Sequence, residues 1–178
     1  FGVAFDHYHS THSAENEALV HEFYGKLRSQ NLISQKNVAQ LFDPIKQMFL
    51  PDRYVKGQCP KCNAADQYGD NCEVCGATYN AQELKAPRSV LSDAVPELRE
   101  SENYFFQVSQ FQDFLKQWIE KDVAHPAVRA KLREWITRDL FDWAISRDAP
   151  YFGFAIPNAA NKYFYVWLDA PIGYLDRK

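Results

Sequence analysis

Apolar side chains recur at helical spacing in three stretches of the chain, and the first of these lies near its start. Ser13 can cap the N-terminus of a helix, and Glu15 and Glu17 follow in what would be the first turn. We therefore predict a helix from Ser13 to about Gln30. Its apolar face contains Leu19, Val20, Phe23, Tyr24 and Leu27.

The other two helical stretches follow one another between residues 109 and 141. Ser109 and Gln112 have the spacing of a capping box, and Pro126 stands where a first helical residue is favoured. We predict two helices whose apolar residues belong to the core rather than to a cofactor site. These residues are Phe111, Phe114, Leu115, Trp118 and Ile119 in the first helix and Val128, Leu132, Trp135 and Ile136 in the second.

The region between the first and second helices has strand-like patterns separated by turns. Residues 38–42 and 47–50 flank an Asp-Pro-Ile-Lys turn and are predicted to form a β-hairpin. Residues 89–91 and 104–108 are further strand candidates. The whole region 32–108 is therefore predicted to be small and mostly β.

A nearly continuous apolar run lies close to the end of the chain, from Lys162 to Pro171. Both of its alternating faces are apolar, as in a strand buried between two layers of helices. We therefore predict a strand of a parallel sheet at this position. Its most apolar part, residues 163–168, is far too short to span a membrane.

All four cysteines belong to two Cys-x-x-Cys pairs, Cys59 with Cys62 and Cys72 with Cys75. Two such turns facing each other supply four thiolates in the tetrahedral arrangement that zinc prefers. A zinc with four protein ligands has no position for water, so it would stabilise the fold without Lewis-acid chemistry. Two disulfides would need an oxidising compartment. Iron in a rubredoxin-like redox centre uses the same ligands, and its colour would distinguish it from zinc.

The composition fits a globular protein. At 178 residues and 46% hydrophobic content, the chain can form one domain or a domain with a small insertion. Its net charge of −3 gives no overall attraction to nucleic acid, so no DNA partner is expected. Arg129 and Arg133, one helical turn apart, could contact phosphate, although such a pair is more typical of a solvated surface. Without a secretory leader or a membrane span, we expect a cytoplasmic protein with no membrane partner.

Three histidines, His7, His9 and His12, lie in a segment without helical periodicity that we predict to be extended or looped. Their spacing is irregular, and Asp6 is the carboxylate nearest to them in sequence. Histidines in polar loops usually face water, so we interpret these residues as loop surface rather than as a second metal site.

Four segments together carry a likeness to a known family. They are Ser-Arg-Asp-Ala-Pro-Tyr-Phe-Gly at 146–153, the tyrosine-tryptophan block at 163–174, and the two cysteine turns with their flanks at 56–62 and 66–77. Taken in their order along the chain, they resemble the bacterial methionyl-tRNA synthetases, which are class I aminoacyl-tRNA synthetases. The chain starts at Phe1 rather than at Met, and the resemblance is to the middle of such an enzyme.

The resemblance implies an α+β fold, in which a β-rich connective peptide with a zinc knuckle is inserted in a split Rossmann-type domain and flanked by helices. Residues 1–30 would end the first half of the nucleotide-binding domain. Residues 31–140 would be the connective peptide, with the knuckle at 59–75 and the two helices near 109–141. Residues 141–178 would begin the second half.

The resemblance also implies site residues and substrates. Trp167, Ala170, Pro171 and Tyr174 would form walls of the methionine side-chain pocket. Arg147 would be the catalytic residue at the active site, near an aspartate in the first half of the domain, outside this sequence. Because a thioether has no strong hydrogen-bonding group, apolar and aromatic walls are suited to select it. The parent enzyme would activate methionine with ATP and esterify tRNA, and the connective peptide would help to place the tRNA acceptor end.

Two departures from the family pattern limit what this chain is expected to do. Family members commonly have a glutamate near the nucleotide where this chain has Ala155. The two class signatures that hold the ATP phosphates in the family are not in this sequence, so we expect the fragment alone to be inactive. The alternative function is a free-standing zinc ribbon that binds protein or nucleic acid. Acidic residues near the knuckle outweigh Lys56 and Lys61, which disfavours this alternative.

Overall fold

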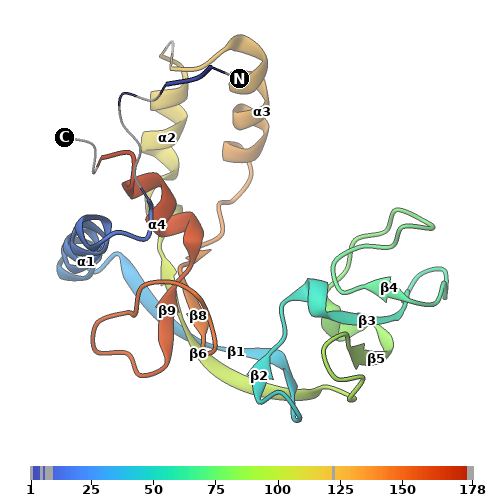
Figure 1. Ribbon diagram of the computed structural model, residues 1–178. Coiled ribbons are helices and arrows are strands. Elements are labelled where there is room, and N and C mark those ends of the chain that lie inside the picture. The colour runs from blue at the N-terminus through green and yellow to red at the C-terminus, as the bar shows by residue number, and fades with distance from the viewer. Residues whose placement is uncertain (1, 5, 7–9, 122, 176–178) are drawn as a thin grey trace. The chain divides into compact units, whose positions relative to one another are not determined.

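The computed structural model describes residues 2–4, 6, 10–121 and 123–175 (Figure 1). These residues form four α-helices and nine strands, which confirms the mixed fold class. Contacts divide the chain into two compact units. We call residues 1–36, 103–147 and 153–178 the helical unit, and residues 37–102 and 148–152 the knuckle unit. The predicted boundaries at 30 and 140 concern the halves of a nucleotide-binding domain, and they remain a prediction.

Helix α1 (Ala14–Ser29) begins where the sequence predicts. The Ser13 hydroxyl accepts a hydrogen bond from the N–H of Asn16 at 3.1 Å, which satisfies one of the free donors at the helix start. After the helix, Asn31 has a φ of 56°, a left-handed conformation that asparagine tolerates. The predicted limits of this helix are therefore confirmed.

The core of the helical unit contains the buried face of α1. Val20 and Tyr24 are buried there, and the Tyr24 and Phe164 rings form a T-shaped contact with 5.1 Å between centroids. Burying side chains of this size stabilises a fold by about 1.5–3 kcal/mol each. The other buried members of this core are Tyr104, Ile145, Phe154, Ile156, Phe164 and Ile172.

Helices α2 (Gln112–Ile119) and α3 (Pro126–Ile136) pack against each other, and Pro126 is the first residue of α3, as predicted. The capping box predicted at Ser109 is wrong. The Ser109 hydroxyl instead donates to Asp142 at 2.8 Å, because a 3₁₀ turn precedes α2.

The core predicted for these two helices is only partly correct. Ile119 and Ile136 are buried, but four of the other predicted core residues are between 41% and 61% exposed. A pair of helices buries only the narrow side of each that faces its partner, so the wider apolar stripe in the sequence stays uncovered within the described residues. The four exposed residues are Phe114, Trp118, Val128 and Trp135.

The apolar block near the end of the chain is not one long strand, which corrects the prediction. Strand β9 covers only Lys162–Phe164, and it pairs with β8 (Ser146–Asp148). The chain then forms helix α4 (Val166–Ile172), in which Asp169 is buried and Trp167 is exposed. A short helix with apolar residues on two sides has the same sequence pattern as a buried strand, so periodicity alone does not separate them.

The predicted β-hairpin is present. Strands β1 (Ile33–Asp43) and β2 (Met48–Phe49) pair antiparallel, with Phe42 opposite Phe49. The strand order of this sheet is β2-β1-β6-β7, where β6 is Glu97–Phe106 and β7 is Trp143–Ala144. The strand predicted at the end of this region therefore stops two residues early, because the chain enters a 3₁₀ turn there.

A second sheet of the knuckle unit has the order β4-β3-β5, and it leads directly into the cysteine turns. Its strands are β3 (Val55–Gln58), β4 (Gln67–Tyr68) and β5 (Lys85–Ser89), so the candidate strand at 89–91 ends at its first residue. A Cβ at Gly57 would lie 2.8 Å from the Lys85 carbonyl oxygen, which explains the glycine where β3 and β5 cross closely. Leu41, Leu50, Val55, Ala81 and Leu84 form the core of this unit. Short 3₁₀ turns lie at Asp52–Tyr54, Ala81–Glu83 and Val108–Phe111.

Candidate metal centre and neighbouring site residues

The four cysteines converge at the end of the knuckle unit, as the sequence predicts. All four Sγ atoms lie within 4.8 Å of one another. The Cys59 and Cys75 sulfurs are 3.8 Å apart, and those of Cys62 and Cys72 are 3.6 Å apart. These separations are far longer than the disulfide bond length of about 2.05 Å. The cysteines are therefore free thiols, which rules out the two-disulfide alternative for this structure.

The sulfur positions fit a four-coordinate metal ion. Zinc–sulfur bonds of about 2.3 Å in a tetrahedron place the sulfurs about 3.8 Å from one another, which agrees with the separations of 3.8 and 3.6 Å. Cys59 and Cys72 are buried, whereas Cys62 and Cys75 are exposed at the surface. The four sulfurs can hold a metal ion, and all four ligands would come from the protein.

Backbone N–H groups lie close to two of the cysteine sulfurs. The N–H groups of Lys61 and Cys62 point at the Cys59 sulfur, at 3.4 and 3.5 Å, and the N–H of Cys75 points at the Cys72 sulfur at 3.4 Å. Such donors stabilise thiolates. Asn63 (φ 61°) and Gly76 (φ 69°) follow the two turns in left-handed conformations.

The thiol pKa values diverge within the cluster. Burial raises the pKa of Cys59, but hydrogen bonds from the N–H groups of Cys62 and Lys61 outweigh burial and lower it to about 6. A hydrogen bond from the N–H of Ala77 lowers the pKa of Cys75, whereas hydrogen bonds with Cys62 and Cys72 raise it, to about 12 in all. Four adjacent thiolates repel one another, so their joint ionisation requires a cation between them.

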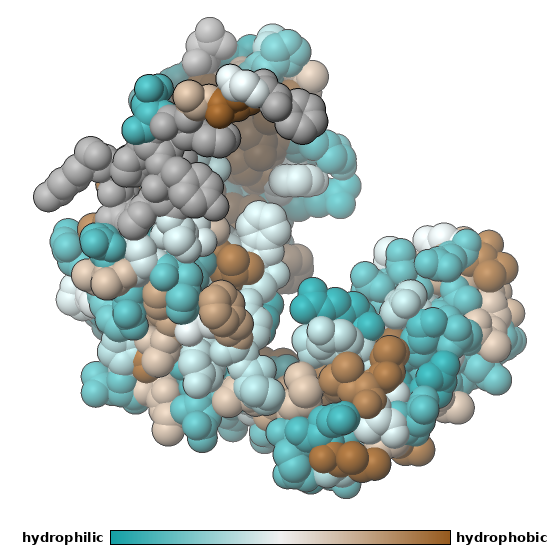
Figure 2. All heavy atoms as spheres, in the orientation of Figure 1, coloured by the Kyte–Doolittle hydropathy of each residue, from teal (hydrophilic) through white to brown (hydrophobic). Residues whose placement is uncertain are grey.

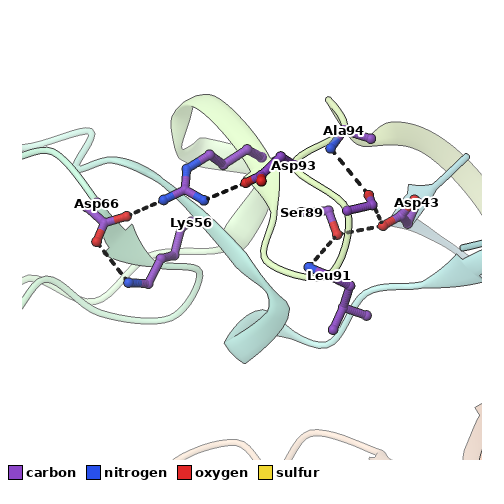
Figure 3. A network of polar contacts seen from close by, with 9 residues as sticks. Asp43, Lys56, Asp66, Ser89, Leu91, Asp93 and Ala94 are labelled. Atoms are coloured by element: carbon purple, nitrogen blue, oxygen red, sulfur yellow. Dashed lines mark hydrogen bonds and ion pairs between the residues drawn. The ribbon is translucent and has the colours of Figure 1, made fainter. Parts of the chain in front are cut away.

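A buried carboxylate ties the β1–β2 hairpin to the loop after β5 (Figure 3). Asp43 is fully buried and accepts hydrogen bonds at 2.6 Å from the hydroxyls of Ser89 and Ser92, and from the N–H groups of Ile45 and Lys46. Burial alone would raise the pKa of Asp43. The hydroxyl and backbone donors outweigh that effect and lower the pKa to about 2, so the carboxylate is charged at neutral pH.

An ion-pair network joins β3 and β5 to the residue that directly precedes β4, next to the cysteine turns. Asp66 accepts from Lys56 at 2.9 Å and from Arg88 at 2.5 Å, and Arg88 also pairs with Asp93 at 3.1 Å (Figure 3). Lys56 and Arg88 are therefore neutralised by carboxylates of the same unit. This pairing leaves little positive charge at these two positions for a nucleic-acid backbone.

The residues predicted for the methionine pocket lie on or just after α4. Trp167 is 60% exposed and Tyr174 is 72% exposed, Pro171 is exposed, and Ala170 is half-buried. Closely spaced on one short helix, they offer an apolar surface, but they do not enclose a pocket within the described residues. Figure 2 shows that hydrophobic residues lie scattered among hydrophilic ones on the visible face.

Arg147 lies on β8 and is half-buried. Its guanidinium carbon is 3.7 Å from the centroid of the Tyr165 ring, and its Nη1 donates to the Ser146 carbonyl at 2.7 Å. Tyr165 is the residue that directly precedes α4. The predicted catalytic arginine is thus held next to the helix that carries the predicted pocket residues.

A small cavity lies elsewhere, between α2 and α3. Its volume is about 120 Å³, below the roughly 300 Å³ at which small-molecule sites begin. Arg133, one of the two arginines considered for phosphate contact, lines it and forms a bidentate pair with Glu120. We therefore assign no ligand to this cavity, and the Arg133 charge is already neutralised.

His7 and His9, considered above as loop surface, lie outside the described residues. His12 stacks on the ring of Phe154 with 4.8 Å between centroids. No helix within the described residues has the length and apolarity needed to cross a membrane.

One family model matches nearly the whole chain. The model of the family described as tRNA synthetases class I (M) matches residues 1–177. The chain belongs to this family.

Close relatives of this synthetase chain are named methionine–tRNA ligase. The one from Stenotrophomonas maltophilia R551-3 is 64% identical over 177 residues, and the one from Xanthomonas campestris pv. campestris B100 is 62% identical. In both cases the match covers 98% of this chain and 26% of the relative. The chain therefore spans about a quarter of the length of the curated relatives that it matches.

Solved structures support the fold of this family member. The methionyl-tRNA synthetase of Mycobacterium tuberculosis bound by methionyl-adenylate aligns with a TM-score of 0.62 over 98% of this chain and 30% of that chain. The free form of the same enzyme aligns with a TM-score of 0.59. At 18% identity, these alignments are evidence for a shared fold only.

Sequence reasoning missed two features of the site region in this synthetase chain. One is the buried Asp43, which reads as an ordinary turn residue before Pro44. The other is Tyr165, which lies in an apolar block whose sequence pattern does not distinguish it from the neighbouring aromatic residues. No local signal distinguishes either residue, because both act through partners distant in sequence.

Proposed function

We propose that this chain is the metal-binding middle part of a methionine–tRNA ligase, which activates methionine with ATP and transfers it to tRNA. The observation that carries the proposal is the family match over residues 1–177, together with relatives of that name at 62–64% identity. Because the chain spans about a quarter of those relatives, the activity belongs to the whole protein. A cytoplasmic location is part of the same proposal.

In this proposal the ion is one structural zinc held by Cys59, Cys62, Cys72 and Cys75. Four thiolates suit a soft or borderline ion, and a full set of protein ligands leaves no position for a reacting water. The zinc supplies folding free energy to a small unit and takes no part in the chemical steps. The connective peptide around it, residues 31–140, helps to place the tRNA acceptor end.

The same proposal gives residues 141–178 to the second half of the nucleotide-binding domain. Trp167, Ala170, Pro171 and Tyr174 form walls of the methionine pocket, completed by parts of the protein outside this chain. The exposure of Trp167, Pro171 and Tyr174 supports this assignment, because an apolar surface uncovered in the fragment is available to a ligand or to another part of the enzyme. Arg147 contributes a positive charge beside them.

The free-standing zinc ribbon that binds nucleic acid is not favoured. Of the three basic residues on the strands beside the cysteine turns, Lys56 and Arg88 are paired with Asp66 and Asp93. The third, Lys85, donates to the side-chain oxygen of Asn63 at 2.7 Å. A nucleic-acid ribbon needs unpaired basic and stacking residues around its knuckle.

The test uses the full-length protein that contains this chain. We expect methionine-dependent exchange of pyrophosphate into ATP, and attachment of methionine to tRNA, with norleucine and leucine as poorer substrates. The isolated chain is expected to be inactive in both assays. Exchange that depends on another amino acid, or no exchange at all by the full-length protein, would overturn the proposal.

The metal is tested separately, by elemental analysis of the purified protein. We expect one zinc per chain and a colourless sample. Stoichiometric iron with visible absorption would replace zinc by a rubredoxin-like centre and leave the enzymatic proposal untouched.

A further inference from the structure

The guanidinium of Arg147 stacks on the ring of Tyr165. The separation of 3.7 Å between the guanidinium carbon and the ring centroid is the shortest of the cation–ring contacts within the described residues. A guanidinium at this distance is attracted by the negative face of the ring, and stacking also restricts the plane in which its N–H donors lie.

Both partners are attached to a rigid frame. Ile145, directly before β8, is buried and donates its N–H to the Tyr104 carbonyl at 2.9 Å, and its own carbonyl accepts from the Tyr165 N–H at 2.8 Å. Ser146, also fully buried, accepts from the Tyr104 N–H at 2.9 Å. These hydrogen bonds fix the backbone at Tyr165 and directly before Arg147. The Tyr165 ring therefore has a fixed position relative to the guanidinium.

Most of the donors of Arg147 are left unused by the described part of the chain. A guanidinium has five N–H donors, and here Nη1 makes the hydrogen bond to the Ser146 carbonyl. Within the described residues no carboxylate forms an ion pair with Arg147. Within the described residues, the half-buried arginine is held by a ring rather than by an acid, which leaves its charge available to an anion from outside this part of the chain.

We propose that Tyr165 is a positioning residue: its ring holds the guanidinium of Arg147 in place for an anionic oxygen of the substrates. That oxygen belongs either to the carboxylate of the amino acid or to a phosphate of ATP. The inference rests on the proposed function and adds to it a residue that touches neither substrate. Tyr165 acts through its π face, so its hydroxyl is not required.

The experiment measures methionine-dependent pyrophosphate exchange by the full-length protein and three variants. Tyr165→Phe keeps the ring and is expected to stay within about twofold of the unchanged protein. Tyr165→Leu and Tyr165→Met keep apolar bulk without a π face, and each is expected to lose about 3- to 30-fold in kcat/KM, the range of a cation–ring contact. Using two ringless variants keeps the comparison valid if one of them folds poorly, as judged by its melting temperature.

A double-mutant cycle separates positioning from general stability. In an Arg147→Ala background, Tyr165→Leu and Tyr165→Met should cost nothing further, because the group that they misplace is gone. A rise in KM for methionine alone assigns the anion to the carboxylate, and a rise in KM for ATP alone assigns it to a phosphate.

Two results would overturn the inference while leaving the proposed function intact. One is an active protein in which both ringless variants match Tyr165→Phe. The other is an equal loss from them with and without Arg147. A full-length protein without methionine-dependent exchange would instead contradict the proposed function itself.

Discussion

The Ser89 hydroxyl donates to the Asp43 carboxylate at 2.6 Å across 46 residues of sequence, and both side chains are fully buried. This contact joins the last residue of β1 to the last residue of β5, and β5 pairs with the strand that leads to Cys59. The buried charge therefore connects β1 with β5, which belong to different sheets.

Loss of the Asp43 charge is expected to destabilise the knuckle unit. Asp43→Asn keeps the shape but weakens the hydrogen bonds from Ser89 and Ser92, and bonds to charged groups contribute about 1.5–3 kcal/mol. We expect the free energy of unfolding in urea to fall by about 2 kcal/mol. The matched control is Asp93→Asn, whose carboxylate is exposed in the neighbouring loop and should cost less than about 0.5 kcal/mol. Equal effects would contradict the role given to Asp43.

The two buried aspartates are expected to affect acid stability in opposite directions. Hydrogen bonds lower the folded pKa of Asp43 to about 2, so its stabilisation is present above the ordinary value of 3.8 and is lost as the pH falls from there towards 2. Burial is the main cause that raises the folded pKa of Asp169. The stabilisation that Asp169 contributes is therefore present below its ordinary pKa, and it is lost as the pH rises through its raised folded-state pKa.

Unfolding measured as a function of pH tests both signs. Asp43→Asn should remove part of the loss of stability between about pH 4 and pH 2. Asp169→Asn should remove the decline that begins above the ordinary value of 3.8 and so should flatten the curve towards neutral pH. If Asp169→Asn leaves the slope in that window unchanged, the carboxyl is not desolvated as the structure indicates.

Loss of one sulfur ligand should open the cysteine turns. Cys72→Ser leaves three thiolates and a poor oxygen ligand. Changes in the partners of metal ligands already cost about 10- to 100-fold in affinity, so we expect at least that loss here, with a lower melting temperature. Zinc content after dialysis against a chelator is the measurement. Val74→Ala, at a 70% exposed position between Cys72 and Cys75, should retain the metal.

The same substitution also tests the structural role of the zinc in the full-length enzyme. Cys72→Ser should lower activity mainly through stability and tRNA positioning. Complete loss of adenylate formation in a protein that keeps its structure would point to a zinc that takes part in the reaction.

Trp167→Ala should impair methionine binding directly while zinc is retained. Truncation of an aromatic hot-spot residue costs about 2 kcal/mol or more, so we expect KM for methionine in pyrophosphate exchange to rise by about 30-fold. Trp135→Ala on α3 is the control, because that side chain is exposed to a similar extent, 57% against 60%. If both variants raise KM alike, Trp167 has no special place in the pocket.

The sequence by itself determined the features whose partners are close along the chain. The helix after Ser13 was predicted with its cap, because that hydrogen bond spans three residues. The hairpin was predicted from its turn, and the four cysteines from two turns that each place both sulfurs on one side. The family likeness likewise rested on contiguous segments, and the family match over residues 1–177 confirmed it.

Only the tertiary structure decided the features that depend on distant partners. The block after Lys162 becomes a three-residue strand and then α4, because pairing with β8 and packing on α1 determine how far each element extends. Ser109 bonds Asp142 rather than capping α2, across 33 residues. The contacts of Asp43 with Ser89 and of Arg147 with Tyr165 follow the same rule. Each contact joins residues that are far apart in the chain. A local sequence pattern does not specify which distant side chain will supply the buried donor or the ring.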